Sequence, residues 1–183
     1  MKRERAPAAN DGAIQLRVAD ISQLFNTLDP FPFAERDLDK DAEEFIVGWA
    51  RELPRDAVLK IVIHMPEKEL HKNDAKTITA ALHRYFDYRA GIIGRDLNEL
   101  FRVGRRSLAI GLAVLALALA ATQAIAGRIE APYGRFVDES LIIIAWVANW
   151  RPMEIFLYDW WPIVRRRNLY RRLAAASVTF KPY

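Results

Sequence analysis

The chain has 183 residues, no cysteine and a formal net charge of +4, and 27% of its residues are charged. Residues 1–106 carry 18 basic and 18 acidic side chains, whereas residues 107–127 carry none. This distribution excludes a simple soluble enzyme, a disordered chain and a disulfide scaffold, and the neutral N-terminal part argues against a nucleic-acid-binding protein.

The N-terminal part predicts a small cytosolic α/β domain over residues 13–72, after a disordered tail at residues 1–12. Residues 14–18 alternate apolar and polar side chains, and residues 57–64 form a β-branched run between two prolines, so both are expected strands. Residues 38–53 lie between them and have apolar side chains at helical spacing. We therefore expect strand, helix, strand, with the two strands parallel through a right-handed crossover.

Residues 73–106 predict an amphipathic stalk helix. Asn73 is a plausible N-cap, and Gly91 and Gly94 are candidate interruptions. The helical register runs on into the uncharged segment without a proline. The expected fold is α+β with a membrane part, in which a cytosolic β-α-β-α domain leads through its last helix into a two-helix transmembrane hairpin.

Two segments predict membrane spans. Residues 107–127 are mostly Leu and Ala, and 21 residues of helix are about 31 Å long, which matches a hydrocarbon core of about 30 Å. Residues 140–164 form the second expected span, although it contains Arg151, Glu154 and Asp159. The alternative for this segment is a half-entering or interfacial helix that bends at Pro152.

The charges of the flanking segments orient this hairpin. Arginines precede the first span and follow the second, whereas residues 128–139 hold two basic and three acidic residues. The positive-inside rule then places both termini in the cytoplasm and residues 128–139 in an outside loop. We expect a bacterial inner membrane, with the second span ending at interfacial aromatic and basic residues: Trp160, Trp161, Arg165, Arg166 and Arg167.

Arg151 and Glu154 form the main candidate site, because they are three residues apart on a helix and can pair. Charges near mid-bilayer cost at least about 2.5 kcal/mol each, so they are expected to face each other, a partner helix or a cavity. Three interpretations stay open: a pair that fixes helix packing, a pore or ligand path, and a contact with another membrane protein.

The first span also offers a packing face. Small residues that recur every three or four positions let helix backbones approach closely, either within the hairpin or in an oligomer. The residues of this predicted face are Ala109, Ala113, Ala116, Ala120 and Ala124.

Three other segments were considered for binding. The loop around residues 25–33 carries four large apolar side chains, which either fold onto the core or form a partner-docking surface: Phe25, Leu28, Phe31 and Phe33. The tail at residues 165–183 has six basic residues and no acidic one, so we expect a lipid-facing helix on anionic lipid. The acidic residues 39–44 are interpreted as a solvated face at a helix start.

No motif for catalysis is present. The chain lacks a phosphate-binding glycine motif, and the spacings of its three histidines match no compact metal site. We therefore expect no enzyme activity, no metal, no cofactor and no nucleic-acid partner.

Two resemblances bear on function. The stretches FNTLDPFPF and NWRPMEIFLYDWWPI are similar to those of uncharacterised two-pass bacterial membrane proteins, a family without an assigned activity that transfers no catalytic residue. Trp150, Met153 and Glu154 are similar to part of the calcium uniporter pore signature, W-D-I-M-E-P. Arg151 stands where that family has an acidic ion ligand, and a cation there repels calcium.

The sequence therefore predicts a structural, accessory or regulatory subunit that forms a homo-oligomer or joins a larger membrane complex. The alternative is a small homo-oligomeric channel or transporter that uses Arg151 and Glu154.

Overall fold

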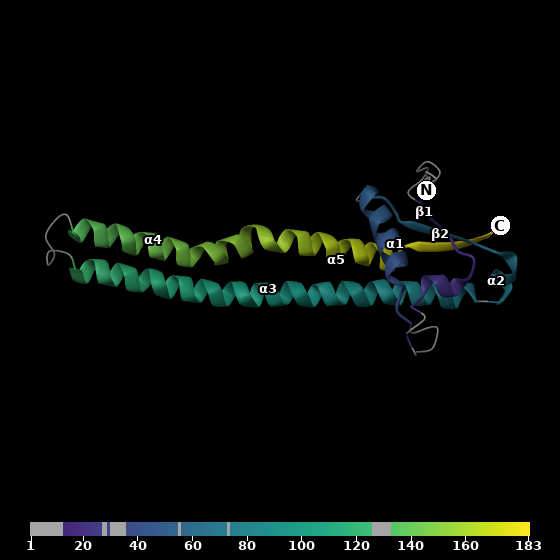
Figure 1. Ribbon diagram of the computed structural model, residues 1–183, viewed down its shortest axis with the longest axis horizontal. Coiled ribbons are helices and arrows are strands. Elements are labelled where there is room, and N and C mark those ends of the chain that lie inside the picture. The colour runs from purple at the N-terminus through teal and green to yellow at the C-terminus, as the bar shows by residue number, and fades with distance from the viewer. Residues whose placement is uncertain (1–12, 27–28, 30–35, 55, 73, 126–132) are drawn as a thin grey trace. The chain divides into compact units, whose positions relative to one another are not determined.

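The computed structural model describes residues 13–26, 29, 36–54, 56–72, 74–125 and 133–183. The protein is mostly helical, with a small parallel three-stranded sheet and two long apolar helices (Figure 1). In chain order its elements are β1 (Ala13–Arg17), the 3-10 turn η1 (Ile21–Leu24), α1 (Lys40–Glu52), β2 (Lys60–Met65), α2 (Glu67–Lys72), α3 (Ala75–Ile125), α4 (Tyr133–Glu154), the π-helical turn η3 (Ile155–Asp159), α5 (Trp160–Ala174) and β3 (Ser177–Pro182).

The chain forms two compact units. Unit 1 consists of residues 1–92 and 166–183, and unit 2 consists of residues 93–165. Helix α3 contributes its first part to unit 1 and the rest to unit 2. The two units are described separately below.

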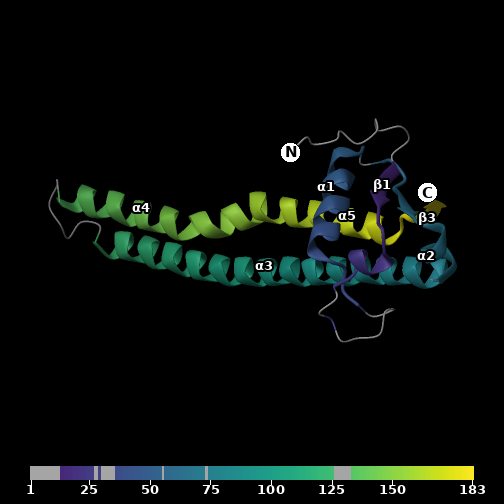
Figure 2. The same ribbon diagram turned by 45° about the vertical axis from the view of Figure 1, so that its right-hand side comes forward.

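Unit 1 is built on a sheet of order β1-β2-β3 in which all strands are parallel (Figure 2). The two predicted strands and their parallel pairing are confirmed, with Ile14 opposite Ile61 and Leu16 opposite Ile63. The third strand was not predicted. It occupies the end of the tail that we expected to lie on lipid, so that expectation is wrong for residues 177–182, which pair with β2 instead.

One face of this sheet forms the core of unit 1. Ile14, Ile61, Ile63 and Met65 are at most 1% exposed. Apolar side chains of the helices are buried with them, including Ile46 of α1, Ile78, Leu82 and Phe86 of α3, and Leu173 of α5. The sheet and its helices therefore form two layers.

Helix α3 is continuous over 51 residues. The helix passes through Gly91 and Gly94, so the predicted interruptions do not occur, and the prediction that the stalk runs directly into the apolar segment is confirmed. Asn73, the predicted N-cap, lies outside the described residues, and Asp74 accepts a hydrogen bond from the backbone N–H of Lys76.

The second apolar helix is longer than predicted. Helical structure runs from Tyr133 to Ala174, so the expected loop at residues 128–139 is at least half helical, and the helix does not end at residue 164. Pro152 lies inside α4, and Pro162 lies near the start of α5. Because each proline lacks an N–H and its ring crowds the carbonyl four residues earlier, the two prolines account for the π-helical turn between them.

A partly buried carboxylate ties three helices of unit 1 together. Glu43 of α1 accepts hydrogen bonds from the hydroxyls of Tyr85 (2.7 Å, α3) and Tyr170 (2.5 Å, α5), and Arg89 of α3 donates to it at 3.2 Å. The Glu43 side chain is only 13% exposed. The predicted solvated face is therefore wrong at Glu43, whereas Asp39 does cap α1 by accepting from the N–H of Asp41.

The pKa shifts in this cluster follow from its contacts. Burial alone would raise the pKa of Glu43, but the hydrogen bonds from Tyr170 and Tyr85 and the charge of Arg89 outweigh burial and lower it. Burial and the hydrogen bond to Glu43 raise the pKa of Tyr85 and of Tyr170. The folded state therefore favours ionised Glu43 and neutral tyrosines.

We expect Glu43→Gln to destabilise unit 1 by about 1–3 kcal/mol at neutral pH, because it removes a charged acceptor from three donors. A group whose pKa is lowered on folding adds stability above its unfolded value, near 4.5 here, and this stability is lost as the pH falls through the folded pKa. The difference in the free energy of unfolding between variant and wild type should therefore shrink below about pH 4. Hydrogen exchange of the β2 amides measures the stability of unit 1 in each protein. Glu44→Gln, at an exposed position of the same helix, is the matched control. Equal stability of both variants would contradict this role.

Candidate functional site: the apolar hairpin

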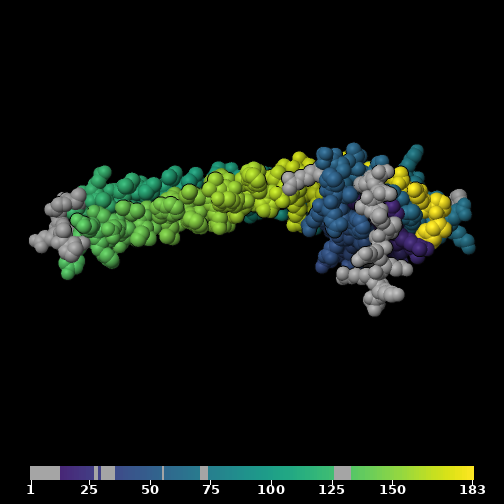
Figure 3. All heavy atoms as spheres, turned by 90° about the horizontal axis from the view of Figure 1, so that it is seen from above, coloured from purple at the N-terminus to yellow at the C-terminus, as the bar shows by residue number. Residues whose placement is uncertain are grey.

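Unit 2 is an antiparallel pair of helices, formed by the second part of α3 and by α4 (Figures 1 and 2). Both helices are long and apolar enough to cross a membrane, and only 11% and 17% of their apolar windows are buried. A core helix of a soluble protein would be mostly buried. The space-filling view shows the side chains of α4 and α3 along one face of this hairpin (Figure 3).

Small residues at seven-residue spacing let the two helices touch. Beyond Leu97, the buried residues of α3 are Gly104, Gly111 and Ala118. A methyl group built at Gly104 would lie 2.9 Å from Ile155, and one at Gly111 would lie 3.0 Å from the carbonyl oxygen of Ala148. Only a glycine leaves room for these approaches, and a seven-residue repeat keeps one face of a helix toward its partner.

A hydrogen bond crosses the contact between α3 and α4, which we call the seam of the hairpin. The amide of Asn149 donates to the carbonyl oxygen of Gly111 at 3.0 Å and to that of Ala145 at 2.8 Å. A larger residue at position 111 would meet the Asn149 side chain and so push it away from the Gly111 carbonyl that it binds. Sequence reasoning missed both glycines and Asn149, although a count of small residues at seven-residue spacing would have found the glycines.

The predicted alanine face lies elsewhere on α3. Ala109, Ala113, Ala116, Ala120 and Ala124 are all exposed. At about 100° per residue they are centred opposite Gly111. As the packing face of the hairpin this prediction is therefore wrong, and a role in an oligomer stays a prediction.

The predicted pair of Arg151 and Glu154 is present, and a third charge joins it. Arg151 lies 2.9 Å from the carboxylate of Glu154 and 3.2 Å from that of Asp159. In a regular α-helix Asp159 would be rotated by about 80° from Arg151. The π-helical turn holds more residues per turn and so brings Asp159 round toward the arginine.

The contacts of Gly104 and Gly111 show which residues of α3 lie beside these charges. Gly104 lies against Ile155 and Phe156, and Gly111 lies against Ala148 and Asn149. In this register Arg151 is level with residue 108 or 109, just inside the first uncharged residue of α3. The charges were expected near mid-bilayer, but they lie at the arginine-flanked end of the uncharged segment.

Acidic residues occupy the other end of α4. In the same register Glu139 is level with residue 120 or 121. The uncharged depth shared by both helices is therefore about 12 residues, or about 18 Å, which is less than a hydrocarbon core of about 30 Å. Asp138 is half-buried there, and its Oδ1 has no hydrogen-bond partner among the described residues.

Exposed aromatic and aliphatic side chains cover the outside of the hairpin. Trp146 and Trp150 pack at 6.0 Å between ring centroids and are 59% and 57% exposed. A groove of about 360 Å³ runs beside them, with almost only apolar residues of α3 and α4 along it, such as Leu115 and Ile142. This surface can contact lipid chains or apolar helices.

The predicted interface residues fall into both units. In unit 2, Trp161 is 58% exposed, and the indole N–H of Trp160 donates to the carbonyl oxygen of Phe156 at 3.0 Å. In unit 1, Arg166 lies over the ring of Tyr170 at 5.8 Å, and Arg172 donates to two carbonyl oxygens of the loop before β2. Arg165 and Arg166 are exposed and Arg167 is half-buried, so part of the basic tail supports the fold.

The predicted docking loop is only partly described. Phe25 is 1% exposed and forms a bridge with Leu38, so it belongs to the core and not to a docking surface. Leu28, Phe31 and Phe33 lie outside the described residues.

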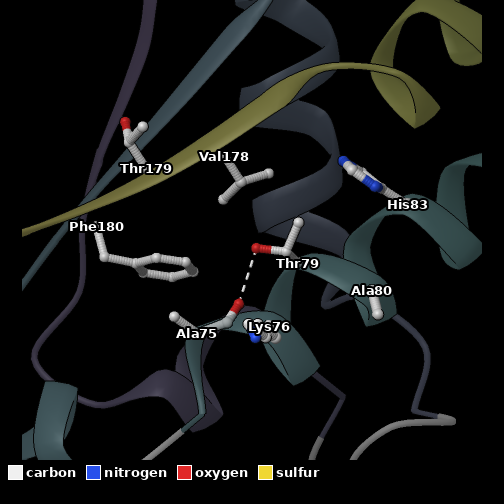
Figure 4. Close-up of a pocket in the computed structure, with 8 residues that line it drawn as sticks. All are labelled: Ala75, Lys76, Thr79, Ala80, His83, Val178, Thr179 and Phe180. Atoms are coloured by element: carbon white, nitrogen blue, oxygen red, sulfur yellow. Dashed lines mark hydrogen bonds between the residues drawn. The ribbon is translucent and has the colours of Figure 1, made fainter.

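A groove of about 650 Å³ in unit 1 lies between the start of α3 and β3 (Figure 4). The side chains of Val178 and Phe180 on β3 face this groove. The Thr79 hydroxyl donates to the carbonyl oxygen of Ala75, and a ring nitrogen of His83 lies 2.8 Å from the carbonyl oxygen of Ala176. No carboxylate lines this groove, and the part of the chain that the structure describes holds no group of three metal-ligating side chains.

Comparison with known proteins gave no match to any family model, curated protein or solved structure. The resemblances to two-pass bacterial membrane proteins and to the calcium uniporter signature remain expectations.

We expect Gly111→Leu to separate the two helices of the hairpin, because its side chain would meet Asn149 and the carbonyl of Ala148; such overpacking costs about 1–3 kcal/mol. Since the chain has no cysteine, spin labels at Leu112→Cys and Val147→Cys report the spacing without background. The distance distribution should broaden and lengthen in Gly111→Leu. Ala113→Leu, on the exposed face, should leave it unchanged, and an unchanged distribution in both would refute the seam.

Proposed function

We propose that the chain is a two-pass integral membrane protein of a bacterial inner membrane, which acts as a structural, accessory or regulatory subunit of a homo-oligomer or a larger membrane complex. The exposed apolar surface of the hairpin carries this proposal. Its large exposed side chains include Ile110, Leu117, Ile143 and Val147, which are between 62% and 71% exposed. Such a surface needs lipid or protein around it.

The charges on α4 support a protein partner in addition to lipid. The uncharged depth of about 18 Å leaves charged groups of α4 inside a hydrocarbon core of about 30 Å. A charged group in hydrocarbon is costly unless it pairs or meets another helix. Neighbouring subunits that cover Asp138 and Glu139 would remove this cost.

The orientation rests on the flanking arginines. Arg105 and Arg106 precede the uncharged part of α3, and Arg165 follows the apolar part of the second helix. With these on the cytoplasmic side, unit 1 and both termini lie in the cytoplasm. Unit 1 then recruits or regulates a cytoplasmic partner.

The competing function is a channel or transporter built on Arg151 and Glu154. Its support is the exposure of the three charged side chains, 57% for Arg151, 42% for Glu154 and 31% for Asp159. Against it, they pair with one another and are level with the arginine-flanked end of α3. They do not form a line of polar groups along the hairpin.

The proposed topology predicts the labelling of single cysteines. Cysteine at Ala131 should react with an impermeant maleimide in intact spheroplasts, whereas cysteines at Ala8 and Ala175 should react only after lysis. The physical reason is that the two uncharged segments place residue 131 on the opposite side from both termini. Labelling of residue 175 in intact spheroplasts would contradict the two-span arrangement.

We expect Arg151→Gln to weaken assembly more than Glu154→Gln does, because it leaves two carboxylates unpaired at the membrane boundary, whereas Glu154→Gln leaves Arg151 paired with Asp159. The mass of the complex extracted gently from its native membrane measures this, with exposed Arg135→Gln as the control. A loss of ion flux in Glu154→Gln with the complex intact would instead favour the channel.

A further inference from the structure

One face of the sheet in unit 1 is open. The helices α1, α3 and α5 contribute their buried residues to the core on the face of Ile14 and Ile61. On the other face Gln15 and Thr179 are exposed, and Val62 between them is only half-buried. Sheets made wholly of parallel strands are normally covered on both faces. The described residues supply no second layer here.

A row of basic side chains crosses this open face. Arg17, His64 and Lys181 are register partners on β1, β2 and β3, so they stand side by side across all three strands. Arg17 and Lys181 are exposed and His64 is half-buried. Lys60 is exposed on the same face at the start of β2. The positions of the three strands on this face hold no acidic residue.

Such a row concentrates positive charge. Arg17 and Lys181 lie on the two outer strands, with His64 of β2 between them, and Lys60 adds a further cation on the same face. Arg17 is partly accommodated, since its guanidinium lies 4.2 Å above the ring of Tyr183, but a cation–π contact leaves the charge in place. A face with three exposed cations, and with no acidic side chain at the strand positions on it, points to an external anionic partner.

We propose that this open face, defined by Arg17, Lys60, His64 and Lys181, docks an acidic amphipathic helix of a partner protein, which supplies the missing second layer of the sheet. Three strands are about 10 Å across, which matches the diameter of one helix. Acidic side chains of the helix would lie over the basic row, and small apolar ones over Val62. This deepens the proposed function, because it states what the cytoplasmic unit recruits.

Two other occupants fit the face less well. The chain's own residues 1–12 carry three basic and two acidic side chains and a proline, so they bring no net negative charge to the row. A bilayer surface is normally met by basic residues together with Trp, Phe or Leu that insert. The aromatic side chain beside this row is Tyr183, whose ring lies against Arg17 and is therefore not free to insert into a bilayer.

The test uses the full chain in nanodiscs of neutral phosphatidylcholine. The probe is a fluorescent 18-residue helical peptide with glutamates along one side and alanine and leucine beside them, and its twin has lysine for every glutamate. The face variant is Lys60→Glu with Lys181→Glu. The control is Lys40→Glu with Arg51→Glu, which changes the charge of unit 1 equally at exposed positions of α1.

We expect wild type to bind the glutamate peptide and not the lysine peptide, with affinity that falls as salt rises. The face variant should lose about tenfold or more in affinity, and the control variant less than about twofold. Hydrogen exchange of the β2 amides must stay unchanged in both variants, so that a loss reports the face and not the fold.

Three results would overturn the inference. Wild type fails to bind the glutamate peptide, both variants bind it equally, or the face variant loses only attachment to vesicles with phosphatidylserine, which would make the bilayer the occupant. The cysteine labelling tests membrane insertion separately. Failure of the docking proposal therefore does not bear on the hairpin, and correct topology does not rescue the docking proposal.

Discussion

The carboxylate of Glu43 is the interaction on which unit 1 depends. Its oxygens accept from Tyr85, Arg89 and Tyr170, so one side chain joins helices from three distant parts of the chain. Tyr170 is followed closely by the turn into β3, and Arg172 holds the loop before β2. The position of α5, which leads into the third strand, is therefore held in part by a hydrogen bond to this anion, whose ionised form the cluster favours.

Local patterns predicted the elements whose cause is local. The β-branched run of β2 and the uncharged run of α3 are determined by residues within one segment, and both are present. The third strand is short and mostly exposed, and pairing with the distant β2 stabilises it. The burial of Glu43 likewise depends on side chains 42 and 127 residues away, which no pattern around residue 43 contains.

The hairpin shows why small residues alone did not identify its packing face. Helix α3 carries alanines on one side and the seven-residue series of Gly104, Gly111 and Ala118 on the other. Alanine is also a good helix former, so its repetition does not select a face. Glycine in a helix costs about 1 kcal/mol relative to alanine, and this cost is offset only where the partner backbone comes close, as it does at Asn149.

Both units leave surfaces incomplete, and the two surfaces differ physically. The hairpin exposes apolar side chains over a short uncharged depth, with charges at both ends. The open face of the sheet exposes a basic row that its own strands cannot neutralise. Apolar contacts in a membrane are insensitive to salt, whereas exposed charge pairs are screened by it. An assembly built on both surfaces would therefore lose the partner docked on the sheet at high salt, while the apolar contacts of the hairpin persist.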